Sequence, residues 1–189
     1  YVWVGSYNRR RAYKIHPEDG RELTRLGLAM SPYGMVTDST GTLWISGLSD
    51  GRLIPIDTVT HEIGAITRYP NHVRGRCNGS YASSIDVYGR IWQSGWTCRD
   101  AVAYDPATDT WCSMHLPGMT QVGRGIATDL DGRVFVAADV GEVSYIAHWH
   151  VDDCVADTRT VVPPAQIIPS GAGQVRGPTA VAFDGQGDV

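Results

Sequence analysis

The 189-residue sequence lacks features that mark two large classes of protein. No apolar run approaches the ~18 residues that a membrane-spanning helix needs, so no membrane insertion of this segment is expected. Lys14 is the only lysine among 16 basic residues, and the formal net charge is −4. Nucleic-acid phosphates require a dense basic surface, so the composition argues against a nucleic-acid partner.

Familiar catalytic and zinc-binding motifs are also missing. The sequence has no Gly-x-Ser-x-Gly, and Gly171-Ala172-Gly173 is too short for a nucleotide-binding loop. Its four cysteines, Cys77, Cys98, Cys112 and Cys154, lack the paired C-x-x-C spacing of zinc sites. The even number suits disulfides in an oxidising compartment, with scattered thiols of a cytosolic protein as the alternative.

A repeat is present. Each copy has a short apolar strand, the turn Asp-x-x-Gly and a second apolar strand. The four copies lie at residues 33–45, 82–92, 125–136 and 180–189. Their aspartates are 48, 43 and 55 residues apart, which is the period of a four-stranded propeller blade with variable loops.

The chemistry of Asp-x-x-Gly places it in a hairpin. Aspartate accepts hydrogen bonds from backbone N–H groups of its own turn, and glycine tolerates the positive φ of a tight chain reversal. Asp129–Gly132 resembles the start of a calcium loop, but the downstream glutamate is missing and the same turn recurs elsewhere. A second turn, rich in Pro, Asp and Thr, recurs at residues 15–22, 56–63 and 104–111 and is expected to join the outer strands.

These patterns predict an all-β chain without a convincing helix: a β-propeller of four-stranded antiparallel blades, with about four blades present. The expected blades are 1–31 (without a first strand), 32–80, 81–123 and 124–177, and 178–189 is the first strand of a further or closing blade. The last strand could complete a four-bladed ring. An arc of a larger ring is the favoured alternative, because both ends look truncated.

The stretch Pro32-Tyr33-Gly34, Asp38 and Gly41-Thr42-Leu43-Trp44, followed by Gly51–Ile56, resembles the repeats of the virginiamycin B lyase (streptogramin lyase) family. It is similar, more loosely, to NHL-repeat and SMP-30/gluconolactonase-type propellers. The resemblance implies the propeller fold. In that family histidines and a glutamate surround a magnesium ion, but residues 43–46, 91–94 and 134–137 lack the glutamate, so no catalytic residue or cofactor is assigned.

The ligand face of a propeller is expected where the loops entering the blades meet the loops between second and third strands. Arginines recur in the entry loops and would form an anion-attracting rim, unless each pairs with a nearby aspartate or carbonyl. These arginines are Arg74, Arg76, Arg124 and Arg176. Tyr33, Tyr81, Trp96 and His72 are expected on the same face, where aromatic rings either bind a sugar or peptide or pack within the blades.

The same geometry bears on the cysteines. Cys77 is expected in the entry loop and Cys98 in the inner loop of one blade, so the two are predicted to form a disulfide. Cys112 and Cys154 belong to outer-strand regions of neighbouring blades, and their pairing is left open. A disulfide favours an extracellular or periplasmic location, with any signal peptide outside this segment.

His148 and His150 are the best metal candidates, because alternate residues of a strand share one face. Outer-strand histidines that simply face solvent are the alternative. The sequence as a whole favours a non-catalytic propeller module of an exported bacterial protein that binds a small ligand or a protein through its loop face. A metal-dependent lyase or lactonase-type enzyme is the alternative, and a structural spacer is the third possibility.

Overall fold

The computed structural model describes residues 1–74, 77–95, 98–115, 121–140, 143–161 and 166–169. Their strands form four sheets that follow one another along the chain. The first contains β1 (Val2–Ser6), β2 (Arg11–Ile15) and β3 (Glu22–Gly27). The second contains β4 (Pro32–Thr37), β5 (Thr42–Gly47), β6 (Arg52–Asp57) and β7 (Thr67–Arg68). The third contains β8 (Ala82–Ile85), β9 (Ile91–Ser94), β10 (Asp100–Asp105), β11 (Thr110–His115) and β15 (Arg159–Val161). The fourth contains β12 (Gln121–Thr128), β13 (Arg133–Val140), β14 (Val143–His150) and β16 (Gln166–Pro169).

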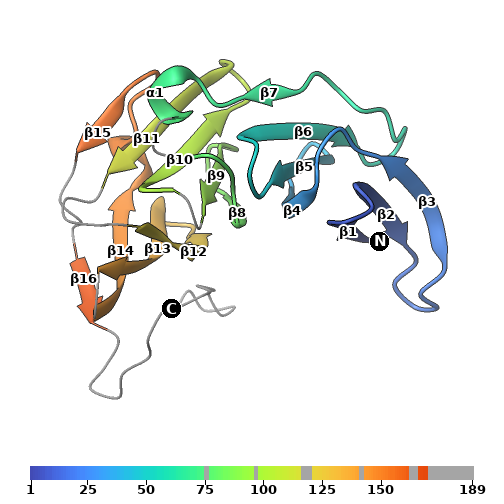
Figure 1. Cartoon of the computed structure of the whole chain (residues 1–189), viewed down its shortest axis with the longest axis horizontal. Helices are drawn as coiled ribbons and strands as arrows, with labels where there is room; N and C mark the ends of the chain where they lie inside the picture. Colours follow the sequence, from blue (N-terminus) through green and yellow to red (C-terminus); the bar gives the residue numbers. More distant parts are fainter. Residues whose placement is uncertain (75–76, 96–97, 116–120, 141–142, 162–165, 170–189) are drawn as a thin grey trace.

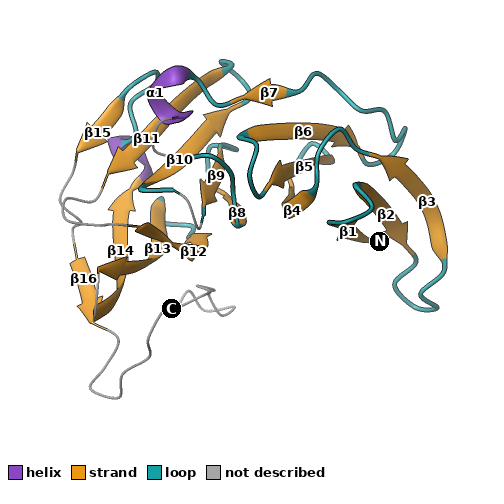
Figure 2. Ribbon diagram, in the orientation of Figure 1, coloured by secondary structure: helices purple, strands orange, loops and turns teal. Residues whose placement is uncertain are grey.

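The four sheets stand side by side along an open arc (Figure 1). Consecutive strands of a sheet pair antiparallel, and the first strands β1, β4, β8 and β12 lie next to one another from sheet to sheet. Strands make up nearly all of the regular structure (Figure 2). The predicted all-β propeller arc is therefore confirmed.

The Asp-x-x-Gly turns are hairpins in the three copies that the structure describes. The aspartate of each turn accepts hydrogen bonds from the backbone N–H groups two and four residues later, in Asp38–Gly41, Asp86–Gly89 and Asp129–Gly132. The glycines have φ values of 86°, 84° and 77°. In the first two turns the second carboxylate oxygen also accepts the indole N–H of Trp44 (2.8 Å) or Trp92 (2.7 Å). The carboxylates are thus occupied in holding the turn, as the hairpin interpretation requires.

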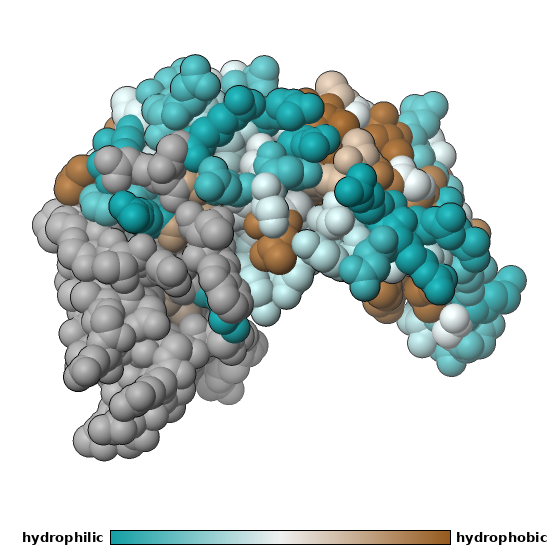
Figure 3. Space-filling model, in the orientation of Figure 1, coloured by the Kyte–Doolittle hydropathy of each residue, from teal (hydrophilic) through white to brown (hydrophobic). Residues whose placement is uncertain are grey.

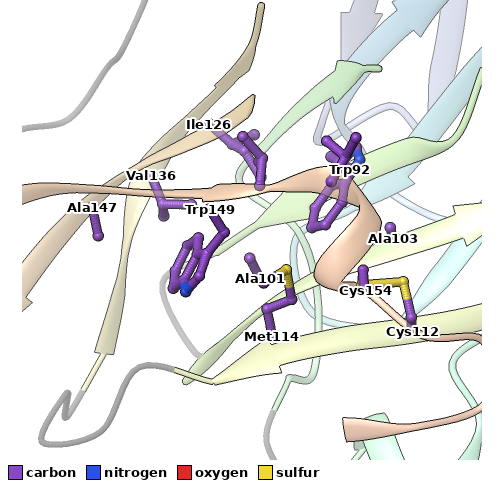
Figure 4. Packing of buried hydrophobic residues seen from close by; sticks show 12 residues of the cluster. Trp92, Ala101, Ala103, Cys112, Met114, Ile126, Val136, Ala147, Trp149 and Cys154 are labelled. Carbon is purple, nitrogen blue, oxygen red and sulfur yellow. A yellow bond between two sulfur atoms is a disulfide. The ribbon is translucent and has the colours of Figure 1, made fainter. Parts of the chain in front are cut away.

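Apolar side chains pack between neighbouring sheets. Figure 4 shows the largest cluster, where Trp92 and Met114 of the third sheet meet Ile126, Val136 and Trp149 of the fourth. Two further clusters occupy the corresponding places between the earlier sheets. Hydrophilic residues cover much of the described surface in the view of Figure 3, with apolar residues in small separate groups. Each blade is therefore stabilised by the next one along the arc.

Two disulfides are present. Cys77 is joined to Cys98 within the loops of the third blade, and Cys112 of β11 is joined to Cys154. The second disulfide ties the segment after β14 back to the third sheet. There β15 pairs in parallel with β11, and the Asp157 N–H donates to the Trp111 carbonyl at 2.6 Å. A fifth, parallel strand thus covers the outer edge of this blade.

The expectation of no helix was wrong for two short segments. Residues Asn71–Arg74 form a single turn, α1, in which the N–H groups of Val73 and Arg74 both donate to the Pro70 carbonyl. Residues Val151–Asp153 form a 3-10 turn, η1, which His150 caps by accepting the Asp152 N–H. One turn carries no amphipathic period, so the pattern could not show it. Across the described ranges, no helix is long and apolar enough to cross a membrane.

Candidate functional site

Three tyrosines form a continuous row across the predicted loop face. Tyr7 follows β1, Tyr33 lies at the start of β4, and Tyr81 directly precedes β8. The ring centroids of Tyr7 and Tyr33 are 6.0 Å apart, and those of Tyr33 and Tyr81 are 4.6 Å apart. The guanidinium of Arg124 continues the row, 5.5 Å from the Tyr81 ring. The structure thus brings together three residues that the sequence placed on this face and adds Tyr7.

Close approach of two inner strands sets the spacing of the row. Gly34 follows Tyr33, and a Cβ at this glycine would lie 2.6 Å from the Oγ atoms of both Ser46 and Ser83. The two serine hydroxyls are themselves 3.2 Å apart. Since only a glycine leaves room here, β4 comes close enough to β8 for the rings of Tyr33 and Tyr81 to make contact.

The Tyr33 hydroxyl remains protonated at neutral pH. A hydrogen bond with Tyr81, together with burial, raises the pKa of Tyr33 above its ordinary value. Tyr7 and Tyr33 nevertheless expose 42% and 39% of their surface, so the row presents open rings with hydroxyl groups. Such a surface can stack on a flat ligand and exchange hydrogen bonds with it.

One cleft adjoins the row at Tyr7, and a second cleft adjoins the first. The first has a volume of about 300 Å³ and includes Tyr7, Arg10, Asp50 and Arg52 in its walls. The second has a volume of about 530 Å³, shares Asp50 with the first, and adds Arg68 and Arg74. These residues come from the β1–β2 turn, the β5–β6 turn, β6, β7 and α1. The first two blades therefore share one recessed, arginine-rich surface, which we call the arginine clefts.

The turn between β5 and β6 fixes the carboxylate that both clefts share. A Cβ on Gly47 would lie 2.7 Å from Oδ1 of Asp50, and Gly51 has a φ of 57° with Tyr69 packed against it. Asp50 is partly buried, and its Oδ2 lies 3.2 Å from Nε of Arg52. Oδ1 of Asp50 and Nε of Arg52 are buried without a hydrogen-bond partner among the described residues. The carboxylate and guanidinium groups of this pair belong to residues that line the first cleft, where a ligand would meet them.

Burial dominates the electrostatics of Asp50. It raises the pKa of this carboxyl group above the ordinary aspartate value, although the positive charges of Arg52, Arg68 and Arg10 oppose the shift. Arg10 is held with a φ of 50°, in the left-handed region that arginine seldom adopts, and its N–H donates to the Tyr7 carbonyl. The tight β1–β2 turn thus presents Arg10 to the first cleft.

The remaining predicted arginines and aromatic residues have mixed outcomes. Arg74 lines the second cleft, and its Nε donates to the Tyr69 carbonyl at 2.7 Å, so it is both a cleft residue and a partner of the backbone. Arg124 lies within β12 instead of in a loop. His72 is in α1, and its buried Nε2 has no partner in the described part of the chain. Arg76, Trp96 and Arg176 lie outside the described residues.

The two metal candidates have other contacts in this structure. The ring of His148 stacks on Phe135 with centroids 5.0 Å apart, while His150 caps η1 and lies 3.2 Å from Asp152. Within the described ranges, no group of three or more His, Cys, Asp or Glu residues could hold a metal ion. A metal site at His148 and His150 remains a prediction.

The clefts contain residues that the sequence pattern missed, namely Tyr7, Arg10, Asp50, Arg52 and Arg68. The first three lie in inner loops that the repeat had located, so the loop assignment itself was the available signal. Arg52 and Arg68 belong to strands. Their position depends on the β6–β7 register, for which the two-residue β7 offers no sequence pattern.

Neither a protein-family model nor a curated protein matches the sequence. Solved structures do resemble this one. Virginiamycin B lyase from Staphylococcus aureus has a TM-score of 0.62 at 16% identity, over 78% of this chain and 50% of that one. The likeness is one of fold.

A streptogramin B lyase structure gives a TM-score of 0.62 at 18% identity, over 79% of this chain and 50% of that one. A nidogen/laminin complex gives 0.67 at 14% identity, over 96% of this chain and 65% of that one. This propeller arc spans about half the length of the lyases it resembles. Enzymes and proteins in complexes thus share its fold, and the fold alone does not choose between them.

Proposed function

We propose that this chain is a non-catalytic β-propeller module that binds a small ligand or a protein partner through its loop face. The tyrosine row carries the proposal. Tyr7, Tyr33 and Tyr81 come from three different blades, yet their rings meet on one face of the arc. Exposed aromatic rings grouped in this way are typical of recognition surfaces, because each offers a flat apolar face and a polar tip.

The surroundings of the row support binding. The arginine clefts adjoin it and give the surface depth, and rigid strands hold both features. A propeller commonly binds at this end, where loops vary while the blades keep their positions. The nidogen/laminin complex, with a similar fold, is an example of such a structure in a protein assembly.

The proposal includes export from a bacterial cell. The disulfides Cys77–Cys98 and Cys112–Cys154 leave no free cysteine among the described residues. Disulfides persist in oxidising compartments and are rare in the reducing cytosol. An extracellular or periplasmic location therefore accounts best for this cysteine usage.

A binding screen with matched variants tests the proposal. The purified chain is applied to oligosaccharide and peptide arrays, and every ligand found is titrated against Tyr33→Ala and the control Tyr88→Ala. Tyr88 is an exposed tyrosine in the Asp86–Gly89 turn at the opposite end of its blade. We expect Tyr33→Ala to weaken binding by about tenfold or more, equal to about 1.4 kcal/mol, and Tyr88→Ala to leave it unchanged.

Two results would count against this function. Equal affinities of Tyr33→Ala and the unmodified chain for every ligand would remove the loop face from recognition. Conversion of a bound ligand to product, lost on chelation of divalent cations, would favour the alternative of a metal-dependent lyase or lactonase-type enzyme.

A further inference from the structure

The arginine clefts carry an unusual local charge. Arg10, Arg52, Arg68 and Arg74 line them together with one carboxylate, that of Asp50. The arginines therefore exceed the carboxylates by three, on a chain whose formal net charge is −4. A positive recess on a negative protein concentrates anions locally.

The fold does not neutralise this charge. Asp50 pairs with Arg52, whereas Arg10, Arg68 and Arg74 form no ion pair with any other described residue. Arg52 and Arg68 stand directly opposite each other in the β6–β7 register. Like charges at opposed positions of an antiparallel pair destabilise a sheet, so their placement costs stability that a bound anion would restore.

The clefts also offer a hydrogen-bond acceptor. Oδ1 of Asp50 is buried and has no hydrogen-bond partner among the described residues, whereas Nε of Arg52 forms an ion pair with Oδ2 of Asp50 but no hydrogen bond. The hydroxyl groups of Ser31 and Ser49 line the first cleft beside them. A ligand that satisfies this site must therefore accept bonds from guanidinium groups and donate at least one bond to a carboxylate.

We propose that the arginine clefts bind the carboxylate of an acidic sugar, a hexuronate unit of an oligosaccharide. This inference rests on the proposed function, because it names the ligand class of the same loop face. The sugar carboxylate accepts bonds from the arginines, and a ring hydroxyl donates to the Asp50 carboxylate. The apolar face of the sugar ring lies on Tyr7, which belongs both to the first cleft and to the tyrosine row.

The structure favours this class over other anions. A phosphate dianion brings a second negative charge beside Asp50, which repels it, and sulfate has no hydroxyl to donate. An acidic peptide donates through backbone N–H groups, whereas a hexuronate carries hydroxyl groups on the same ring as its carboxylate. The cleft volumes of about 300 and 530 Å³ lie at the size of small-molecule sites.

Isothermal titration with defined probes tests the proposal. The probes are a glucuronate-containing disaccharide, the neutral disaccharide with glucose in its place, inorganic sulfate, and an aspartate-rich peptide. The variants are Arg10→Ala and Arg68→Ala. Arg21→Ala is the control, because Arg21 is exposed, contacts Asp19 and lies in the β2–β3 turn at the other end of the blade.

We expect the glucuronate disaccharide to bind about tenfold or more tightly than the neutral one. Both cleft variants should weaken its binding about tenfold or more, the loss expected for one charge-assisted bond, whereas Arg21→Ala should not. Circular dichroism verifies that each variant keeps its strand content. Asp50→Asn should reduce the preference for the sugar over sulfate, because an amide nitrogen cannot accept a hydrogen bond from the sugar hydroxyl.

Several outcomes would overturn the inference. Equal binding of the two disaccharides, or no binding of the glucuronate probe, would remove the acidic sugar. If the aspartate-rich peptide binds more tightly than the glucuronate disaccharide and Arg10→Ala abolishes this binding, the clefts belong to a protein partner. If sulfate binds as tightly as the disaccharide, the clefts are an unspecific anion site. None of these results touches the proposed function if Tyr33→Ala still weakens some other ligand. That function fails only where the tyrosine row has no effect on any ligand.

Discussion

Replacing Asp86 by asparagine should destabilise the protein much more than the same change at the equivalent Asp38. Asparagine keeps the oxygen that accepts two backbone N–H groups but puts an NH2 group in place of Oδ2. In the unmodified protein, Oδ2 of Asp86 accepts hydrogen bonds from the Arg90 Nε–H and the Trp92 indole N–H, both at 2.7 Å. Oδ2 of Asp38 accepts a hydrogen bond only from the indole N–H of Trp44. Comparing the two variants therefore separates the contribution of the Arg90 hydrogen bond to stability from that of the indole hydrogen bond.

The expected size follows from burial. Asp86 is buried, Trp92 is fully buried, and the Arg90 side chain is 12% exposed. Losing the charge-assisted bond costs about 1.5–3 kcal/mol, and leaving the buried indole N–H unpaired costs about 1–3 kcal/mol. Since such losses are not additive, we expect about 3–5 kcal/mol for Asp86→Asn. Asp38→Asn lacks the arginine bond and should cost about 1 kcal/mol.

Urea unfolding followed by tryptophan fluorescence measures both changes under the same conditions. The difference between the two variants should be about 2 kcal/mol or more. Arg90→Gln supplies a further check, because it removes the same bond from the other side and also weakens the contact between Arg90 and the Val151 carbonyl. If Asp38→Asn and Asp86→Asn lose the same free energy of unfolding, the hydrogen bond between Arg90 and Asp86 adds no stability and the reasoning is refuted.

Three further predictions concern the disulfide strap and the clefts. Cys112→Ala combined with Cys154→Ala opens a loop with a sequence separation of 42 and should lower the free energy of unfolding by about 4 kcal/mol, measured by urea unfolding. Gly51→Ala forces a left-handed alanine 3.0 Å from the Tyr69 ring and should lower the melting temperature, with a cost of about 1–2 kcal/mol. The preference for glucuronate over sulfate should decline as the pH is lowered, and at a higher pH than for an ordinary aspartate, because burial raises the pKa of Asp50 and protonation weakens it as an acceptor of the sugar hydroxyl. Titration of Asp50→Asn should show no such decline.

The blade hairpins could be predicted from the sequence because their determinants are local. Asp38, Asp86 and Asp129 each bond within their own four-residue turn, so the motif carries its structure wherever it occurs. The Tyr33–Tyr81 contact was also within reach. Both residues occupy the same position at a blade entrance, and a propeller brings these entrances together.

The arginine clefts could not be predicted, because they depend on distances between blades. Arg10 meets Asp50 only because the β1–β2 turn of one blade lies beside the β5–β6 turn of the next. The angle and spacing of neighbouring blades follow from packing of entire sheets, which no repeat period specifies. Arg68 faces Arg52 through a two-residue strand, too short to show alternation.

The return of β15 to the third sheet was hidden for a similar reason. Arg159 bonds to the buried carboxylate of Asp100 at 2.8 Å across a separation of 59 residues. His115 approaches the same carboxylate at 2.8 Å from β11. The Arg159 contact comes from outside the four-stranded blade period, so the repeat assigned this segment to the fourth blade alone. The Cys112–Cys154 disulfide was the one feature of the sequence that connected the two blades.

Hydrogen–deuterium exchange with and without the glucuronate disaccharide tests the central claim, ligand binding at the loop face, most directly. Peptides that contain residues 7–10 and 48–52 should exchange more slowly in the bound protein, because the ligand covers the β1–β2 and β5–β6 turns. Peptides that contain residues 38–42 and 86–90, at the opposite end of the blades, should exchange at the same rate in both states. Protection confined to residues 38–42 and 86–90 would place the ligand on the wrong face and contradict the account.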